Sequence, residues 1–139
     1  MILLLRALFI GILAVMLWGT VRASLEQALF DIPPEVTGNP WFQVTLLDAY
    51  FAFITFYVLI AWKEQRTAAR ILWLPVVLLW GNFAMAAYML RELFAVRAAD
   101  PAALNQLFTT RRPGRLALPV GFLIAGVFVY LLGAKNLLA

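Results

Sequence analysis

Four long runs of apolar residues, separated by polar segments, dominate this sequence. They extend over approximately residues 2–22, 41–63, 70–92 and 116–136. A helix needs about 20 predominantly apolar residues to cross the hydrocarbon core of a bilayer, and each run reaches that length. The pattern therefore predicts an all-α protein, an integral membrane bundle of four helices that forms a single domain over residues 1–139.

The first and third polar segments carry signals for short helices of their own. Ser24 followed by Gln27 fits a capping box, which predicts an interfacial helix over residues 25–30. Asp100-Pro101 is typical of a helix start, and apolar residues follow it at helical spacing. We therefore expect short interfacial helices in both loops, lying on the membrane surface.

Composition supports a membrane location and narrows the chemistry. The chain is 65% apolar and 13% charged, and it contains no Cys and no His. The absence of these two residue types excludes disulfides, thiolate nucleophiles and thiolate or imidazole metal sites. We expect no metal site and no cofactor, and favour a protein that is not an enzyme. The net charge of +4 comes from basic residues at helix ends and in loops, which indicates contact with lipid headgroups rather than nucleic acid.

With four crossings, the distribution of basic residues hardly distinguishes the two possible orientations in the membrane. With the N-terminus in the cytoplasm, five cations face inward: Arg6, Lys63, Arg66, Arg70 and Lys135. Six face outward: Arg22, Arg91, Arg97, Arg111, Arg112 and Arg115. The first helix usually dominates, and Arg6 precedes most of it, so we favour a cytoplasmic N-terminus in a bacterial inner membrane.

The first run also allows a second interpretation, as a cleaved signal peptide. Residues 7–21 have a suitable length for its apolar core, and Val21-Arg22-Ala23 resembles a small-residue cleavage motif. Arg22 fits that motif poorly, and the apolar stretch begins before Arg6, so a retained helix is favoured.

Polar residues inside the second and third runs mark a candidate site. Asp48 lies seven residues after Trp41, about 10 Å along a helix, and Asn82 lies nine residues before Arg91, about 13 Å. Antiparallel helices would place both at similar depth. The predicted cluster consists of Asp48, Asn82, Tyr88 and Arg91, with Thr20, Arg22, Thr45, Tyr50 and Thr55 as further contributors.

Two interpretations of this cluster stay open. An ionisable residue in hydrocarbon is costly and marks a functional site by default. An Asp and an Asn that hydrogen-bond across two helices also serve as structural contacts in a small bundle. Flanking residues Trp41 and Trp62, with the pair Lys63-Glu64, are interpreted as anchors in the headgroup layer.

The second run resembles a known family. Its pattern is similar to that of a family of small membrane proteins of bacteria and plants, which is known as a domain of unknown function, DUF1475. The matching segments are Pro40-Trp41, then Thr45-Leu46-Leu47-Asp48-Ala49-Tyr50, then Trp62-Lys63-Glu64. The resemblance covers residues of about 2–94. It implies a membrane location and no assigned activity.

Three functions remain in competition. The first is a non-enzymatic protein of the lipid bilayer that works as a homo-oligomer or through a membrane-protein partner. The second is an oligomeric carrier or channel for a proton, ion or small metabolite that uses Asp48. The third and weakest is an intramembrane enzyme that modifies lipids, for which the sequence offers no second close acid beside Asp48 and no nucleophile motif.

Overall fold

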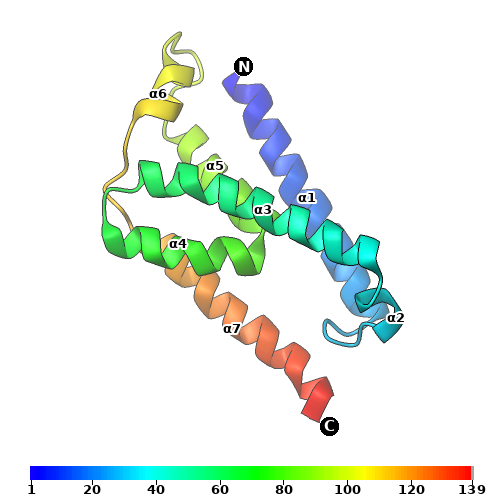
Figure 1. Cartoon of the computed structure of the whole chain (residues 1–139). Helices are drawn as coiled ribbons and strands as arrows, with labels where there is room; N and C mark the ends of the chain where they lie inside the picture. The colour runs from blue at the N-terminus through cyan, green and yellow to red at the C-terminus, as the bar shows by residue number, and fades with distance from the viewer. Residues whose placement is uncertain (139) are drawn as a thin grey trace.

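The structure, a computed structural model, describes residues 1–138 and the side chains of residues 1–134. Its elements are α1 (Ile2–Glu26), α2 (Pro34–Thr37), α3 (Pro40–Lys63), α4 (Thr67–Trp80), α5 (Asn82–Phe94), α6 (Ala103–Thr109) and α7 (Ala117–Leu138). Every element of this described part is helical, which confirms the all-α prediction. The helices are arranged as Figure 1 shows, with α1, α3 and α7 as the long members.

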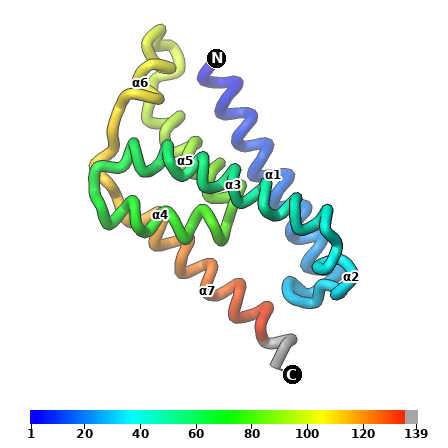
Figure 2. Tube along the Cα trace, viewed as in Figure 1, coloured from blue at the N-terminus to red at the C-terminus, as the bar shows by residue number. Residues whose placement is uncertain are grey.

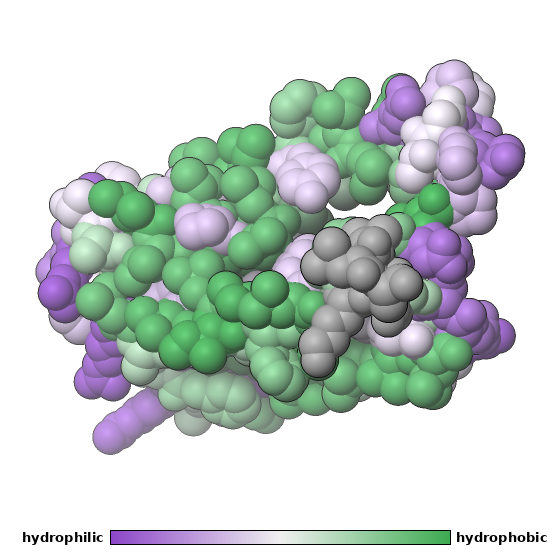
Figure 3. All heavy atoms as spheres, turned by 90° about the horizontal axis from the view of Figure 1, so that it is seen from below, coloured by the Kyte–Doolittle hydropathy of each residue, from purple (hydrophilic) through white to green (hydrophobic). Residues whose placement is uncertain are grey.

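Within residues 1–138, three helices and not four are long and apolar enough to cross a membrane. They are α1, α3 and α7. Few residues in their apolar stretches are buried, so most of their side chains face outward. The surface in Figure 3 is correspondingly apolar over most of the face shown, with polar residues gathered at its edges.

The predicted third crossing, over residues 70–92, is broken at Gly81. The chain there forms α4 and α5, of 14 and 13 residues, or about 21 and 20 Å. Neither reaches the length of a crossing. Gly81 has φ 48° and ψ −122°, a backbone conformation that glycine adopts and other residues avoid. The prediction of a fourth crossing is therefore wrong, because the chain turns back at this glycine. Pro75, by contrast, lies within α4 without ending it.

The two ends of this α4–α5 hairpin lie together, at the end of the molecule that also holds the start of α1 (Figure 2). The Arg6 guanidinium donates to the carbonyls of Leu93 and Val96, each at 2.9 Å. Arg91 of α5 pairs with Glu64, which directly follows α3. We call this region the network end.

The tip of the hairpin lies beside the middle of α7 and α3. The Trp80 indole donates to the carbonyl of Phe122 at 2.8 Å, and the Tyr130 hydroxyl donates to that of Leu79 at 3.2 Å. A Cβ at Gly81 would lie 2.5 Å from the ring of Phe53. The tip of the hairpin thus packs against α3 and α7, and the chain turns back there at Gly81.

Two apolar clusters form the core, and α5 contributes to both. One joins α1, α5 and α6 through Ile2, Met89, Leu93, Val96, Ala103 and Leu107. The other joins α3, α4 and α5 through Ile60, Trp73, Val76, Val77, Ala84 and Tyr88. Because α5 packs on two sides, six of its 13 residues are buried.

The short loop helices agree with the sequence in part. The predicted helix over residues 25–30 does not form, because α1 continues to Glu26; α2 follows later in the same loop. The helix predicted after Asp100 is confirmed as α6, and the Asp100 carboxylate accepts from the amide of Ala102 at 2.8 Å.

Replacing Gly81 by alanine should weaken the fold. The new Cβ would meet the Phe53 ring, and the backbone conformation would be strained by about 1–2 kcal/mol before any repacking. We expect Gly81→Ala to lower the melting temperature of the protein in detergent. Gly121→Ala is the matched control, since nothing lies within 4 Å of its Cβ position. Equal melting temperatures for both variants would contradict this account of the turn.

Candidate functional site

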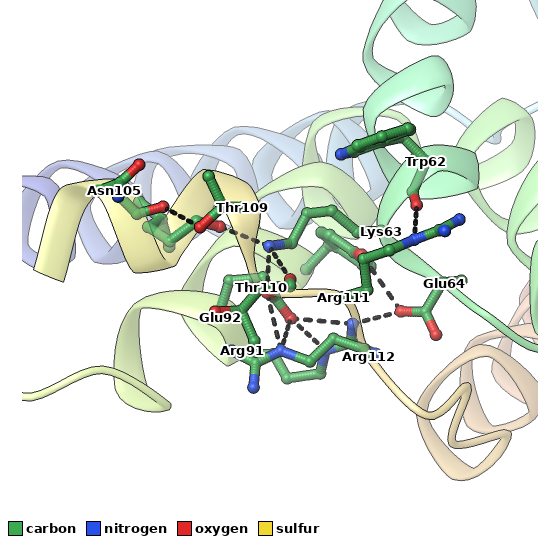
Figure 4. Close-up of polar contacts among 12 residues, drawn as sticks. Trp62, Lys63, Glu64, Arg91, Glu92, Asn105, Thr109, Thr110, Arg111 and Arg112 are labelled. Atoms are coloured by element: carbon green, nitrogen blue, oxygen red, sulfur yellow. Dashed lines mark hydrogen bonds and ion pairs between the residues drawn. The ribbon is translucent and has the colours of Figure 1, made fainter.

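Charged side chains from three distant segments meet at the network end. Lys63 ends α3 and Glu64 follows it, Arg91 and Glu92 lie in the last turn of α5, and Arg112 lies between α6 and α7. Figure 4 shows these side chains converging from their separate elements. We call these five residues the ionic network.

Glu92 is the centre of the ionic network. Its carboxylate is fully buried. It accepts from Lys63 Nζ at 2.8 Å, from Arg91 Nη2 at 3.0 Å and from Arg112 Nε at 2.9 Å to both oxygens. Three cations therefore surround one acid, which offsets the cost of burying its charge.

Glu64 supplies the second acid, and it too is fully buried. Its Oε1 accepts from the Tyr88 hydroxyl at 3.2 Å and from Arg91 Nη2. Its Oε2 has no hydrogen-bond partner among the described residues. The backbone carbonyl of Glu64 accepts from Arg70 Nε at 2.7 Å, so the residue links α3, α4 and α5.

Main-chain contacts fix the segment before α7 against the end of α3. The amide of Arg112 donates to the carbonyl of Lys63 at 2.7 Å, and the amide of Gln65 donates to that of Arg112 at 2.9 Å. Lys63 Nζ also donates to the carbonyls of Thr110, at 3.0 Å, and Leu107, at the end of α6. A cation at a helix C-terminus is favourable, so one lysine serves both the acid and this helix.

Gly114 allows this close approach of two loops. Its φ is 78°, and a Cβ there would overlap with Cβ of Arg66. A side chain at this position would separate the segment before α7 from the loop between α3 and α4.

The charges of the ionic network favour anion binding over proton transfer. Burial opposes ionisation of Glu92, but the hydrogen bonds and charges of Lys63 and Arg112 outweigh it and hold the pKa of Glu92 below its usual range. Glu92 therefore stays ionised at neutral pH. Three cations against two acids leave the five residues with a net charge of +1.

The structure brings together only part of the predicted cluster. Tyr88 and Arg91 both donate to Glu64, which takes the place that the prediction gave to Asp48. Asp48 and Asn82 are both exposed, and no hydrogen bond or ion pair joins them within the described chain. The expectation of similar depth assumed that the third run crosses the membrane, and the turn at Gly81 removes that assumption.

The remaining candidates lie outside the ionic network. Arg22 pairs with Glu26 of its own helix at 3.0 Å, and Thr20 is exposed. The hydroxyls of Thr45 and Thr55 donate to carbonyls of α3 itself. Tyr50 packs edge-on against Phe53, with ring centroids 5.7 Å apart.

Lys63 and Glu64, interpreted as a charge pair in the headgroup layer, do not pair with each other in the structure, and their role as anchors stays a prediction. Both residues are buried, and each binds other partners, Glu92 for Lys63 and Arg91 for Glu64. One sequence signal was available: the second and third runs both end in a cation followed by an acid, Lys63-Glu64 and Arg91-Glu92. The tryptophans Trp41 and Trp62 are exposed near helix ends, and their role as anchors stays a prediction.

Within residues 1–138 no group of three His, Cys, Asp or Glu side chains is placed to hold a metal ion. Comparison with known protein families gives a match over nearly the whole chain. A family described as "Protein of unknown function (DUF1475)" matches residues 1–136. No curated protein and no solved structure matches the chain.

Removing the central acid should destabilise the protein strongly. Glu92→Gln leaves Lys63 and Arg112 without their buried counter-charge, a change that typically costs about 3–5 kcal/mol. We expect a large drop in melting temperature in detergent at neutral pH. Because the pKa of Glu92 is lowered in the fold, its contribution is complete above the unfolded pKa of about 4.3 and is lost as the pH falls through the folded value.

The wild-type melting temperature should therefore decrease at acidic pH, and Glu92→Gln should show a smaller decrease. Glu35→Gln is the control, because this acid is exposed in α2 and the charge change is the same. A Glu92→Gln variant as stable as Glu35→Gln would show that the network contributes little.

Proposed function

The chain belongs to the DUF1475 family of proteins of unknown function, and from this premise we propose that it is a non-enzymatic, multi-pass membrane protein that acts by assembling with another membrane helix along one face of α3. This face, which we call the Asp48 face, consists of Thr45, Asp48, Ala52 and Thr55. The observation that carries the proposal is the exposure of Asp48 on an apolar helix.

Asp48 lies deep enough along α3 to need a partner. It follows the first residue of the helix, Pro40, by eight residues, or about 12 Å. None of the side chains at positions 1–134 gives it a hydrogen bond or an ion pair. A carboxylate facing hydrocarbon costs several kcal/mol, so we expect a donor or cation from another helix to cover it.

The neighbours of Asp48 suit close approach of such a helix. The hydroxyls of Thr45 and Thr55 donate to the carbonyls of Trp41 and Phe51, at 2.8 and 2.9 Å. Their own hydrogen-bonding needs are therefore met within α3. What remains is a surface of small side chains with one acid, which is typical of helix interfaces in membranes.

The other two functions have less support. A carrier that uses Asp48 would need its path to form between copies, because this residue faces away from the packed helices. It would show a pH-dependent flux in liposomes that disappears in Asp48→Asn. A lipid-modifying enzyme with Glu64 as acid or base would have to release that carboxylate from Tyr88 and Arg91.

The hairpin also supports an orientation. Because the α4–α5 hairpin would enter and leave the membrane at the same side, nine of the 11 basic residues fall at the network end. They are Arg6, Lys63, Arg66, Arg70, Arg91, Arg97, Arg111, Arg112 and Arg115. The opposite side keeps Arg22 and Lys135. Because basic residues accumulate on the cytoplasmic side, we propose that the network end and the N-terminus are cytoplasmic, in a bacterial inner membrane.

Cysteine cross-linking tests the assembly. The chain contains no Cys, so a single Ala52→Cys substitution gives one thiol on the Asp48 face. We expect it to form a disulfide-linked dimer in membranes, and Asp48→Asn to reduce the yield. Leu47→Cys is the control, because residue 47 is exposed, is adjacent to Asp48 in the sequence and lies on another face of α3.

Equal cross-linking at positions 47 and 52 would contradict a specific face. No cross-linked dimer at position 52, together with a smaller complex on native gels for Asp48→Asn, would assign the Asp48 face to a different protein. No cross-link and an unchanged complex would refute assembly along this face.

Labelling of single cysteines tests the topology. Val36→Cys lies beyond the far end of α1, and Ala99→Cys lies at the network end. In intact bacterial cells, a membrane-impermeant maleimide should label position 36 and spare position 99, and inverted vesicles should reverse this result. A chain with four crossings would place both positions on one side, so labelling of both in intact cells would overturn the hairpin topology.

A further inference from the structure

A pocket of about 480 Å³ opens beside the ionic network. Its lining is Arg91, Phe94, Ala95, Arg112, Pro113 and Arg115. These residues come from the end of α5 and from the segment that leads into α7. The pocket therefore combines three arginines with an apolar wall, at the end of the molecule where the basic residues gather.

The arginines offer hydrogen-bond donors to this pocket. Arg112 uses its Nε for Glu92, and neither terminal nitrogen has a partner within the described chain. Arg91 uses Nε and Nη2 for the two acids, which leaves Nη1. Arg115 is exposed and makes no side-chain hydrogen bond or ion pair with residues 1–134. Adding its charge raises the net charge of this region to +2.

Two of the three guanidinium groups are held in place before any ligand arrives. Glu92 and Glu64 bind Arg91, and Glu92 binds Arg112. The Arg91 guanidinium also lies over the ring of Tyr88, at 4.4 Å from its centroid. A preorganised site loses less conformational entropy on binding, and planar guanidinium groups match the oxygens of a phosphate.

An apolar wall lies beside the arginines in the same pocket. Phe94 is 60% exposed, and Ala95 and Pro113 lie next to the arginines. Arg6 from the start of α1 lies over the Phe94 ring at 4.8 Å, so a long apolar helix begins beside the pocket. A ligand with a phosphate and an apolar tail would fit both parts.

We propose that this pocket binds a phosphate group, which either an anionic phospholipid headgroup or a water-soluble phosphate ester supplies. Basic pockets beside membrane helices on the cytoplasmic side are typical sites for anionic headgroups. The proposal does not depend on assembly along the Asp48 face, because the pocket and Asp48 share no residue.

Native mass spectrometry of the purified full chain in detergent tests the pocket. Phosphatidylglycerol and phosphatidylcholine with the same acyl chains are titrated separately, and glycerol 3-phosphate is the soluble probe. Arg115→Gln is the test variant, since Arg115 takes no part in the ionic network and its loss leaves that network intact. Arg97→Gln is the matched control, an exposed arginine at the network end outside the pocket.

We expect tighter binding of phosphatidylglycerol than of phosphatidylcholine, and about fivefold weaker binding of it by Arg115→Gln than by Arg97→Gln. Glycerol 3-phosphate that binds without lipid and competes with phosphatidylglycerol would assign the pocket to a soluble phosphate ester. Binding of the lipid alone would assign it to a headgroup. Equal affinity for both lipids without binding of glycerol 3-phosphate, or equal losses in the two variants, would overturn the proposal.

Discussion

The burial of Glu92 among three cations is the interaction on which the rest of the structure depends. Lys63 comes from the end of α3, Arg91 from α5 itself, and Arg112 from the segment before α7. Removing Glu92 would leave the buried Lys63 without its acidic partner, a far larger penalty than the loss of a surface pair. The ionic network therefore requires the end of α3, the end of α5 and the segment before α7 to lie together. Lys63 also donates to carbonyls at the end of α6, so it holds that helix at the same place.

The turn at Gly81 makes this meeting possible. If the third apolar run crossed the membrane as one helix, Glu64 and Arg91 would lie near opposite faces, too far apart for an ion pair. Because the chain reverses at Gly81, α5 returns towards the end from which α4 started. A break in a helix at membrane depth is tolerated when protein surrounds it, and here Phe53 and α7 enclose the tip. The turn also gathers the basic residues at one end, which determines both the proposed orientation and the proposed phosphate pocket.

The long helices contrast with this enclosed hairpin. α1, α3 and α7 expose most of their apolar side chains, and nothing lies within 4 Å of the Cβ positions of Gly11 or Gly121. The spacing of small residues around those glycines suits close packing of helices, but the described chain does not use it. In a membrane, lipid would cover such surfaces at little cost but would not satisfy the hydrogen-bonding needs of Asp48. For this reason the Asp48 face, rather than the glycine surfaces, carries the proposed assembly.

The sequence by itself determined the helical class, the outward apolar surfaces and the positions of α1, α3 and α7, because length and hydropathy are local properties that a bilayer constrains directly. It also singled out Asp48, Thr45 and Thr55 as polar residues within an apolar run, and the structure leaves all three exposed. Only the tertiary structure decided the number of crossings, because one glycine in an apolar run is compatible with either a straight helix or a turn, and its contact with Phe53 is needed to distinguish them. The ionic network was likewise out of reach: Lys63, Glu92 and Arg112 are far apart in sequence, and charges at helix ends look exposed until packing encloses them.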